Sequence, residues 1–222
     1  MAIRSPFPIL PSPVPSSLRL TRPNPASNPP PPRALGLGLG GAAAAPLRAK
    51  AELLSLIADQ ERGLRTQSDA KKRAEIVAAI EALGTLGSDQ VTTGSSLSGT
   101  WRMLWTTEKE QLFIIKNAYL FGTRTGDVLQ VIDVERRSLN NVITFPPSGV
   151  FFVRSSIEAA PPQRVNFKFT SAVLRGSNWE IPLPPFGQGW FESIYLDDDI
   201  RVAKDIRGDY LVVDRASYSW KE

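Results

Sequence analysis

The sequence predicts a mainly β protein, in which a helical hairpin precedes one small antiparallel β-barrel. From Leu97 onward, β-branched and aromatic residues alternate with polar ones at period two between turns rich in Gly, Pro and Asp. Residues 51–83 instead place apolar side chains at helical spacing. Gly99-Thr100-Trp101 adds a third signal, because glycine lets the backbone approach closely where a large indole plugs the closed end of a barrel.

Residues 1–48 differ in composition from the rest of the chain. Six basic residues and 12 of the 19 prolines precede the first acidic residue, Glu52. An Arg- and Ser-rich segment without acids is typical of an organelle transit peptide, and its composition cannot bury a core. We therefore expect residues 1–48 to be a disordered chloroplast transit peptide; the alternative is a disordered cytosolic tail.

The run Ala34–Ala45 is short and rich in Gly and Ala. It falls below the roughly 20 apolar residues that span a bilayer, so we expect no transmembrane segment. A second, weaker interpretation is the export core of a thylakoid-lumen signal.

The basic character of the chain, a net charge of +4 with a pI near 9.5, belongs to the leader. Residues 1–51 contain six basic residues and no acidic one; without them, 20 basic and 22 acidic residues remain, which is a net charge of −2 and predicts no nucleic-acid partner. The chain has no Cys and no His. This excludes disulfides, thiolate or imidazole metal sites and the Cys–His or Ser–His–Asp nucleophiles, and it leaves any catalysis to carboxylates, lysine, tyrosine or a bound cofactor. No motif points to either, and we expect no cofactor and no enzymatic activity.

Residues 49–88 are expected to form the helical hairpin. Its two apolar stripes are Leu53, Leu54 and Ile57, then Ile76, Val77, Ile80 and Leu83. Arg62-Gly63-Leu64 separates the helices, Ser68 or Asp69 caps the second one, and Gly84 ends it. The polar face mixes acidic and basic residues, which argues against a helix that lies on a membrane surface.

Residues 97–222 are expected to form the barrel. After the strand that carries Trp101, Met103 and Trp105 on one face, the pattern predicts strands at Leu112–Phe121, Val128–Val134, Asn141–Phe145, Val150–Glu158, Arg164–Phe169, Trp190–Leu196, Ile200–Lys204 and Tyr210–Val213. Eight or nine strands suit a closed barrel whose interior holds one small ligand. A two-sheet sandwich is the alternative, because periodicity does not report closure.

Three segments carry a resemblance to a known family: Leu97–Thr107, Gly189-Trp190-Phe191 and Tyr195–Ala203. They resemble the plastid-lipid-associated proteins, also called fibrillins, whose members show an LxGxWxLxYT opening, an Arg-Gly between N-terminal helices and a closing YLDxDLRI segment. The resemblance covers nearly all of residues 52–215 and implies an antiparallel lipocalin-like β-barrel. Trp105 stands where tyrosine is usual, and Asp205-Ile206-Arg207-Gly208 makes a longer turn than the family pattern.

The resemblance implies a non-enzymatic plastid protein that binds hydrophobic small molecules, such as lipids or prenylquinones, and associates with plastoglobules or thylakoids. The segment Ile200–Arg215 is most similar to one branch of the family. That branch implies an alternative role, as a protein partner of a polyprenyl (solanesyl) diphosphate synthase in plastoquinone biosynthesis.

Candidate ligand contacts are inward-facing aromatic residues, because a lipid offers little but apolar area. They are Trp105, Phe113, Phe121, Phe152, Phe167 and Phe169, each of which also fits an ordinary packed core. Gly99, Trp101 and Arg201 are expected to close the barrel. Arg201 either lies over the Trp101 indole or pairs with Asp197–Asp199 at the surface.

The proline-framed segment 179–187 is the candidate surface for a partner or a lipid, through Pro182, Leu183, Pro184, Pro185 and Phe186. The alternatives are a lid over the barrel mouth and a packed crossing loop. Asp197-Asp198-Asp199 fits a solvated turn better than a calcium or magnesium site, because EF-hand spacing is absent. A carboxylate enzyme that uses Glu192 and Asp197 is the remaining enzymatic hypothesis.

Overall fold

The computed structural model describes residues 39–121, 123–184 and 187–222, so most of the predicted transit peptide (1–48) lies outside the described residues. The helices are α1 (Leu39–Ile57), α2 (Ala70–Leu86) and α3 (Lys109–Asn117), with short 3-10 turns at Arg65–Gln67, Ser95–Leu97 and Ala118–Phe121. The strands are β1 (Gly99–Thr106), β2 (Val128–Asp133), β3 (Ser138–Phe145), β4 (Gly149–Ala160), β5 (Arg164–Arg175), β6 (Glu180–Leu183), β7 (Gln188–Leu196), β8 (Ile200–Asp205) and β9 (Tyr210–Arg215). Among the described residues, none of the helices combines the length and the apolar character that a membrane span requires.

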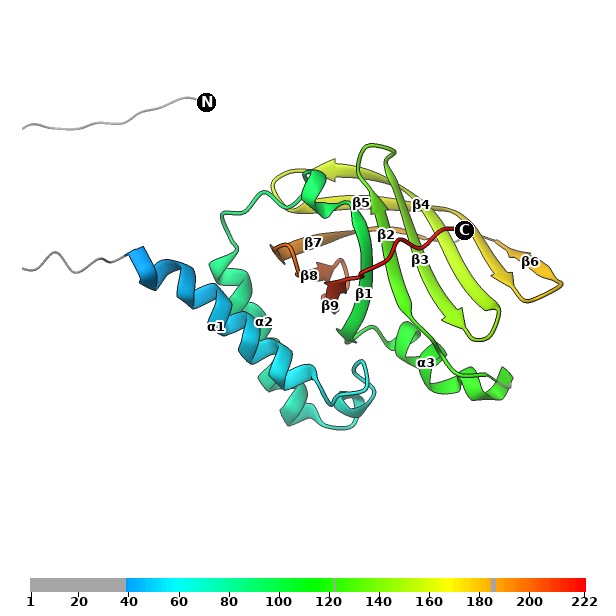
Figure 1. Ribbon diagram of the computed structural model, residues 1–222, viewed down its shortest axis with the longest axis horizontal. Helices are drawn as coiled ribbons and strands as arrows, with labels where there is room; N and C mark the ends of the chain where they lie inside the picture. Colours follow the sequence, from blue (N-terminus) through cyan, green and yellow to red (C-terminus); the bar gives the residue numbers. More distant parts are fainter. Residues whose placement is uncertain (1–38, 122, 185–186) are drawn as a thin grey trace, which may run out of the picture. The chain divides into compact units, whose positions relative to one another are not determined.

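All nine strands belong to one antiparallel sheet, and eight of them pair in a ring. Neighbours along the chain pair from β1 to β5, then β5 with β7, β7 with β8 and β8 with β9, and β9 returns to β1. The long strand β5 pairs with β7 through residues 164–168 and with the short strand β6 through residues 172–175. The sheet therefore closes on itself as the predicted barrel rather than splitting into two sheets (Figure 1).

The helical hairpin covers the outer face of the barrel at β1 and β7–β9. Helices α1 and α2 run side by side (Figure 1), and Leu53, Ile76 and Ile80 are fully buried in a cluster with Trp105 and Val202. Asp69 caps α2 as expected, because its Oδ1 accepts a hydrogen bond of 2.9 Å from the Lys72 backbone N–H. Burial of these apolar side chains, and not helix propensity alone, holds the hairpin on the sheet.

Three local predictions were wrong. Residues 112–121 form α3 and a 3-10 turn instead of a strand, because a short apolar run fits either structure and Leu112 and Ile115 share a helix face. Helix α2 continues past Gly84 to Leu86, and Gly84 lies against Ile194. Helix α1 begins at Leu39, so residues 39–48 are helical and not disordered, in keeping with the helix propensity of their alanine run.

Candidate ligand-binding cavity

A cavity of about 480 Å³ lies inside the barrel. Its wall is mostly apolar, and the side chains that lie in the barrel core include Met103, Ile114, Leu139, Ile143, Phe151, Phe167, Phe191, Ala203, Leu211 and Val213. This volume lies within the range of small-molecule sites in proteins, about 300–1,000 Å³. The interior is therefore large enough for a ligand.

Trp101 plugs the closed end of the barrel. It is fully buried, and its Nε1 donates a hydrogen bond of 2.9 Å to the Leu97 carbonyl oxygen. The Arg215 guanidinium lies 4.2 Å from the indole centre and donates to the carbonyl oxygens of Ser96 and Ser98. Gly99 has φ +148°, and a Cβ there would lie 2.5 Å from Arg215 Nη1, so glycine leaves the space that this arginine fills.

Arg201 lies inside the barrel beside this plug. Its guanidinium carbon is 5.5 Å from the Trp101 ring and 5.3 Å from the Phe191 ring, and its Nη2 donates to Gln130 Oε1. Burial lowers the pKa of Arg201, which has no carboxylate partner among the described residues. The alternative prediction, that Arg201 pairs with Asp197–Asp199 at the surface, is wrong. Lys50 takes that place, because its Nζ pairs with Asp197 at 2.8 Å and with Asp199 at 2.7 Å.

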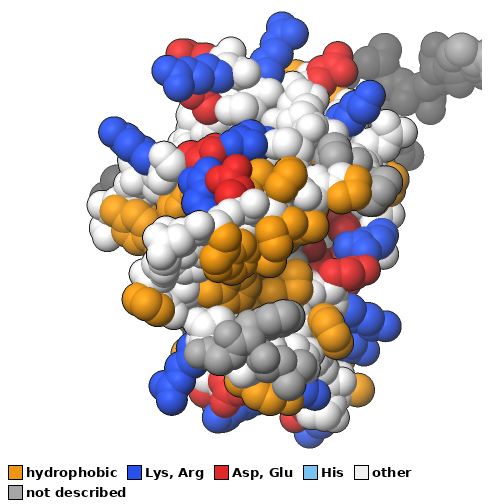
Figure 2. Space-filling model, turned by 90° about the vertical axis from the view of Figure 1, so that its right-hand side faces the viewer, with side chains coloured by type: hydrophobic (Ala, Val, Ile, Leu, Met, Phe, Trp, Pro, Cys, Tyr) orange, Lys and Arg blue, Asp and Glu red, His pale blue; other side chains and the backbone are white. Residues whose placement is uncertain are grey.

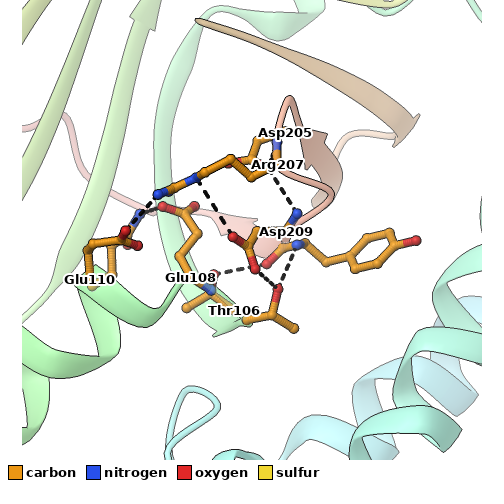
Figure 3. Close-up of polar contacts among 9 residues, drawn as sticks. Thr106, Glu108, Glu110, Asp205, Arg207 and Asp209 are labelled. Carbon is orange, nitrogen blue, oxygen red and sulfur yellow. Dashed lines mark hydrogen bonds and ion pairs between the residues drawn. The ribbon is translucent and has the colours of Figure 1, made fainter. Parts of the chain in front are cut away.

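The opposite end of the cavity carries a charged rim, which we define as Glu108, Glu110, Asp205, Arg207 and Asp209. Figure 3 shows Arg207 reaching from the β8–β9 turn toward α3, where it pairs with Glu110 at 2.6 Å. Arg207 also lies 3.5 Å from Asp205 and 3.9 Å from Asp209. The turn that departs from the family pattern thus places a cation among four carboxylates.

Glu108 is the most perturbed acid of the rim. Burial raises its pKa to about 7, although a hydrogen bond from Gln111 Nε2 (2.6 Å) acts in the opposite direction. Asp205 and Asp209 raise this pKa further, whereas Arg207 lowers it. The charge of the rim therefore changes near neutral pH.

The structure brings two of the six predicted ligand residues into the cavity. Phe167 and Phe169 line it, with ring centroids 5.3 Å apart. Phe113 lies on α3 and is 67% exposed, and the Phe121 side chain lies outside the described residues. Trp105 and Phe152 are fully buried, but on the outer face of the barrel.

Local backbone geometry explains the two outward-facing residues. A bulge in β1 between Met103 and Trp105 breaks the alternation, so Trp105 faces the helices and donates to Thr66 Oγ1 at 3.2 Å. Phe152 packs against Trp220 on the outside, whereas its neighbour Phe151 lines the cavity. Two adjacent phenylalanines in a strand must face opposite ways, and composition alone does not say which one faces inward.

An apolar groove of about 590 Å³ runs outside the barrel beside the cavity. We define it by Ile114, Phe145, Pro146, Pro147, Phe151, Leu174 and Trp179, and its members Ile114 and Phe151 also line the cavity. Next to it, Ile181 and Leu183 of β6 are 49% and 38% exposed. Figure 2, which views the side that carries β6, shows hydrophobic side chains gathered in the middle with charged ones around them.

Part of the predicted surface segment is a strand and not a loop. Residues 180–183 form β6 on β5, and Pro182 and Leu183 are exposed, as is Pro184. Pro185 and Phe186 lie outside the described residues. The two carboxylates of the enzymatic hypothesis both form ion pairs with basic residues. Glu192 pairs with Arg164 at 2.7 Å, and Asp197 pairs with Lys50.

Sequence reasoning missed Phe151, Phe191 and the polar pair Gln130 and Asn141, all of which line the cavity. The alternation of inward and outward side chains along a strand could have identified Gln130 and Asn141. Gln130 lies between the inward-facing Val128 and Ile132, and Asn141 between Leu139 and Ile143. A polar residue between two core positions of one strand marks a polar point on the inner wall.

The comparisons with known proteins agree with this architecture. The family model described as PAP_fibrillin matches residues 47–214. The chain is 71% identical over 175 residues to probable plastid-lipid-associated protein 11, chloroplastic, of Arabidopsis thaliana, covering 79% of this chain and 82% of that protein. It is 26% identical over 195 residues to plastid-lipid-associated protein 6, chloroplastic, of the same plant, covering 73% and 68%.

No solved structure matches the chain significantly. Both relatives are chloroplast proteins, and the chain is assigned to the chloroplast with them. The family model matches residues 47–214, and the match to plastid-lipid-associated protein 11 covers 79% of this chain at 71% identity. The chain therefore belongs to the plastid-lipid-associated protein (PAP/fibrillin) family.

Proposed function

We propose that this protein binds a hydrophobic small molecule, a lipid or a prenylquinone, in the barrel cavity without chemical turnover. The observation that supports this most is the apolar cavity of about 480 Å³ at the centre of a closed barrel. A well-packed protein interior leaves few voids larger than a water molecule, so a cavity of this size supports a ligand-binding role. Ligand burial would stabilise a complex by about 25 cal/mol for each Å² of apolar surface removed from water.

The groove suggests how such a ligand reaches the cavity. Ile114 of α3 and Phe151 of β4 line both spaces, so these two side chains stand between the groove and the interior. Both are only partly buried and pack on the core from its edge. A rotamer change at this pair is a small motion that would join the two spaces.

The apolar groove and β6 also fit contact with a lipid surface, at a plastoglobule or thylakoid. Trp179, a member of the groove, is 52% exposed, and the exposed Ile181 and Leu183 follow it in β6, where Ile181 is the register partner of the groove residue Leu174. Exposed apolar patches of this kind mark sites of lipid or protein contact. A ligand would then pass from the lipid phase to the cavity without crossing water.

The synthase partner that the family resemblance implies stays a prediction. A pull-down of a polyprenyl diphosphate synthase with the full chain tests it, together with product-length assays in the presence and absence of this protein. A complex that changes the product or the activity would favour this role, and no complex would remove it.

The cavity is tested by titrating the full chain with the neutral fluorescent lipid analogue N-undecyldansylamide. We expect saturable binding, with dansyl fluorescence enhanced by energy transfer from buried tryptophan. Ala203→Leu adds bulk to the cavity wall and should weaken binding at least about tenfold, because the interior tolerates extra volume poorly. Ala159→Leu adds the same bulk at an exposed position of β4 and serves as the matched control. Absence of saturable binding would contradict the proposed function.

A further inference from the structure

Three polar side chains form a hydrogen-bonded chain along the inner wall of the barrel. Arg201 Nη2 donates to Gln130 Oε1, and Gln130 Nε2 donates to Asn141 Oδ1 at 2.9 Å. Gln130 is the register partner of Trp101 in β1 and of Asn141 in β3, so this hydrogen-bonded series of side chains lies at the closed end of the cavity. Gln130 and Asn141 line the cavity, whereas Arg201 is completely buried behind it.

Arg201 fixes the direction in which these hydrogen bonds are donated. A guanidinium has only donors, so the carboxamide oxygen of Gln130 must face Arg201 and its NH₂ group must point away. That NH₂ group in turn fixes the oxygen of Asn141. Asn141 is left with its own NH₂ group as the terminal donor, and no acceptor for Asn141 Nδ2 is found among the described side chains and backbone.

The positive charge of Arg201 favours the same direction of hydrogen-bond donation, from Arg201 toward Asn141. Arg201 Nε and Nη1 are buried without a hydrogen-bond partner in the described structure, so the positive charge is balanced by no carboxylate and polarises the amides in front of it. The acidic side chains gather at the other end, where Glu108, Glu110, Asp205 and Asp209 surround Arg207. The cavity therefore has a donor at its inner end and a mainly acidic rim.

We propose that the cavity selects an elongated apolar molecule that carries a neutral carbonyl group, which enters first and accepts a hydrogen bond from Asn141 Nδ2. This inference rests on the proposed function, that the cavity is a ligand site. A carbonyl oxygen satisfies the terminal donor and has no donor of its own to leave unpaired in an apolar pocket. A carboxylate would satisfy the donor as well, but it must pass four acidic side chains and lose its hydration on entry.

The test compares two probes of equal length, 2-undecanone and undecane, by calorimetric titration of the full chain. We expect the ketone to bind about threefold to tenfold more tightly than the alkane. Asn141→Leu keeps the branched shape of the side chain and its number of heavy atoms but removes the donor, so the two probes should then bind equally. Asn140→Leu changes the neighbouring residue, which lies on the outer face of β3, and should preserve the preference.

A second readout does not depend on affinity or on the fold of one variant. The carbonyl stretch of bound 2-undecanone should shift to lower frequency in the wild type, as a hydrogen-bonded ketone does, and return to the frequency of an apolar solvent in Asn141→Leu. Gln130→Glu should have a similar effect, because a carboxylate facing Arg201 cannot donate to Asn141 and leaves that amide free to turn.

The outcomes separate the two proposals. Equal binding of ketone and alkane by the wild type, with an unshifted carbonyl stretch, would overturn the carbonyl preference and leave the cavity as a general apolar site. If neither probe nor the dansyl lipid binds, both proposals fall. Tighter binding of undecanoate than of 2-undecanone at about pH 8 would show that the inner end selects an anion, which also overturns the preference for a neutral group.

Discussion

The guanidinium carbon of Arg201 lies 5.5 Å from the centre of the Trp101 indole ring, and both side chains are fully buried. Arg201→Lys keeps the charge but loses the planar group that lies over the ring and reaches Gln130. We expect a loss of about 1–3 kcal/mol in the free energy of unfolding, measured in urea. Arg102→Lys, at a partly exposed ion pair with Asp214 on the outer face, should cost less than about 1 kcal/mol. Equal losses for the two variants would contradict a special role for the buried arginine.

Gly63 lies in the loop between α1 and α2 and packs against the end of β1. Its φ is +110°, and a Cβ at this position would lie 2.2 Å from the Thr106 carbonyl oxygen. Gly63→Ala should therefore destabilise the protein by more than about 1 kcal/mol, through strain and through loss of the Thr106 N–H bond to Arg62 O (3.1 Å). Gly94→Ala, at a position with negative φ and open space around it, is the control and should change stability by less than about 1 kcal/mol. A stable Gly63→Ala variant would show that this junction tolerates rearrangement.

Glu108 makes stability depend on pH near neutrality. Its pKa in the folded protein, about 7, exceeds the ordinary value of 4.5, so between these values the folded state binds more protons than the unfolded chain. The stabilising contribution of protonated Glu108 is present at low pH and is lost as the pH rises through 7. Glu108→Gln should be more stable than the wild type by about 2 kcal/mol at pH 8, and the difference should be small at pH 5.

Urea unfolding of both proteins at the two pH values checks this sign. Glu110→Gln is the comparison on the same helix, because a backbone hydrogen bond at its own N–H and the nearby Arg207 hold the pKa of Glu110 below its usual value. This variant should show no gain at pH 8. A gain from Glu110→Gln equal to that from Glu108→Gln would assign the effect to the net charge of the rim and not to the desolvation of Glu108.

The apolar surface beside the groove predicts lipid contact. Replacing Trp179, Ile181 and Leu183 by serine should reduce co-flotation with phosphatidylcholine vesicles at least about tenfold, since these three side chains provide exposed apolar area. Val91→Ser removes an apolar side chain that is 67% exposed but lies outside this surface, and it should leave flotation unchanged. Flotation that survives the triple substitution would place the lipid contact elsewhere on the chain.

How far the sequence predicts this structure depends on the kind of signal. The period-two pattern of residues 128–213 identifies most strands, and the indole at position 101 together with Arg201 identifies the closed end. It is harder to predict which side chains face into the barrel and which face outward, because one bulged residue in β1 turns Trp105 toward the helices. The polar chain through Gln130 and Asn141 depends on strand register, which local sequence does not specify.

The rim depends on contacts over a long range in sequence. Glu108 looks like an ordinary surface acid in the sequence, and only the packing of α3 against the β8–β9 turn raises its pKa. The sequence pattern predicts a strand at residues 112–121, where the structure has α3 and a 3-10 turn, so it does not reveal this packing. Its apolar run was too short for periodicity to decide between helix and strand.

The chain has two methionines, Met1 and Met103, and Met103 lines the cavity. Labelling of the methionine methyl groups with ¹³C therefore places a single NMR reporter inside the barrel and a second one at the N-terminus. Titration with 2-undecanone should shift the Met103 methyl signal in a saturable manner and leave the Met1 signal in place. An unchanged Met103 signal at a concentration that saturates binding would contradict the claim that the barrel interior is the ligand site.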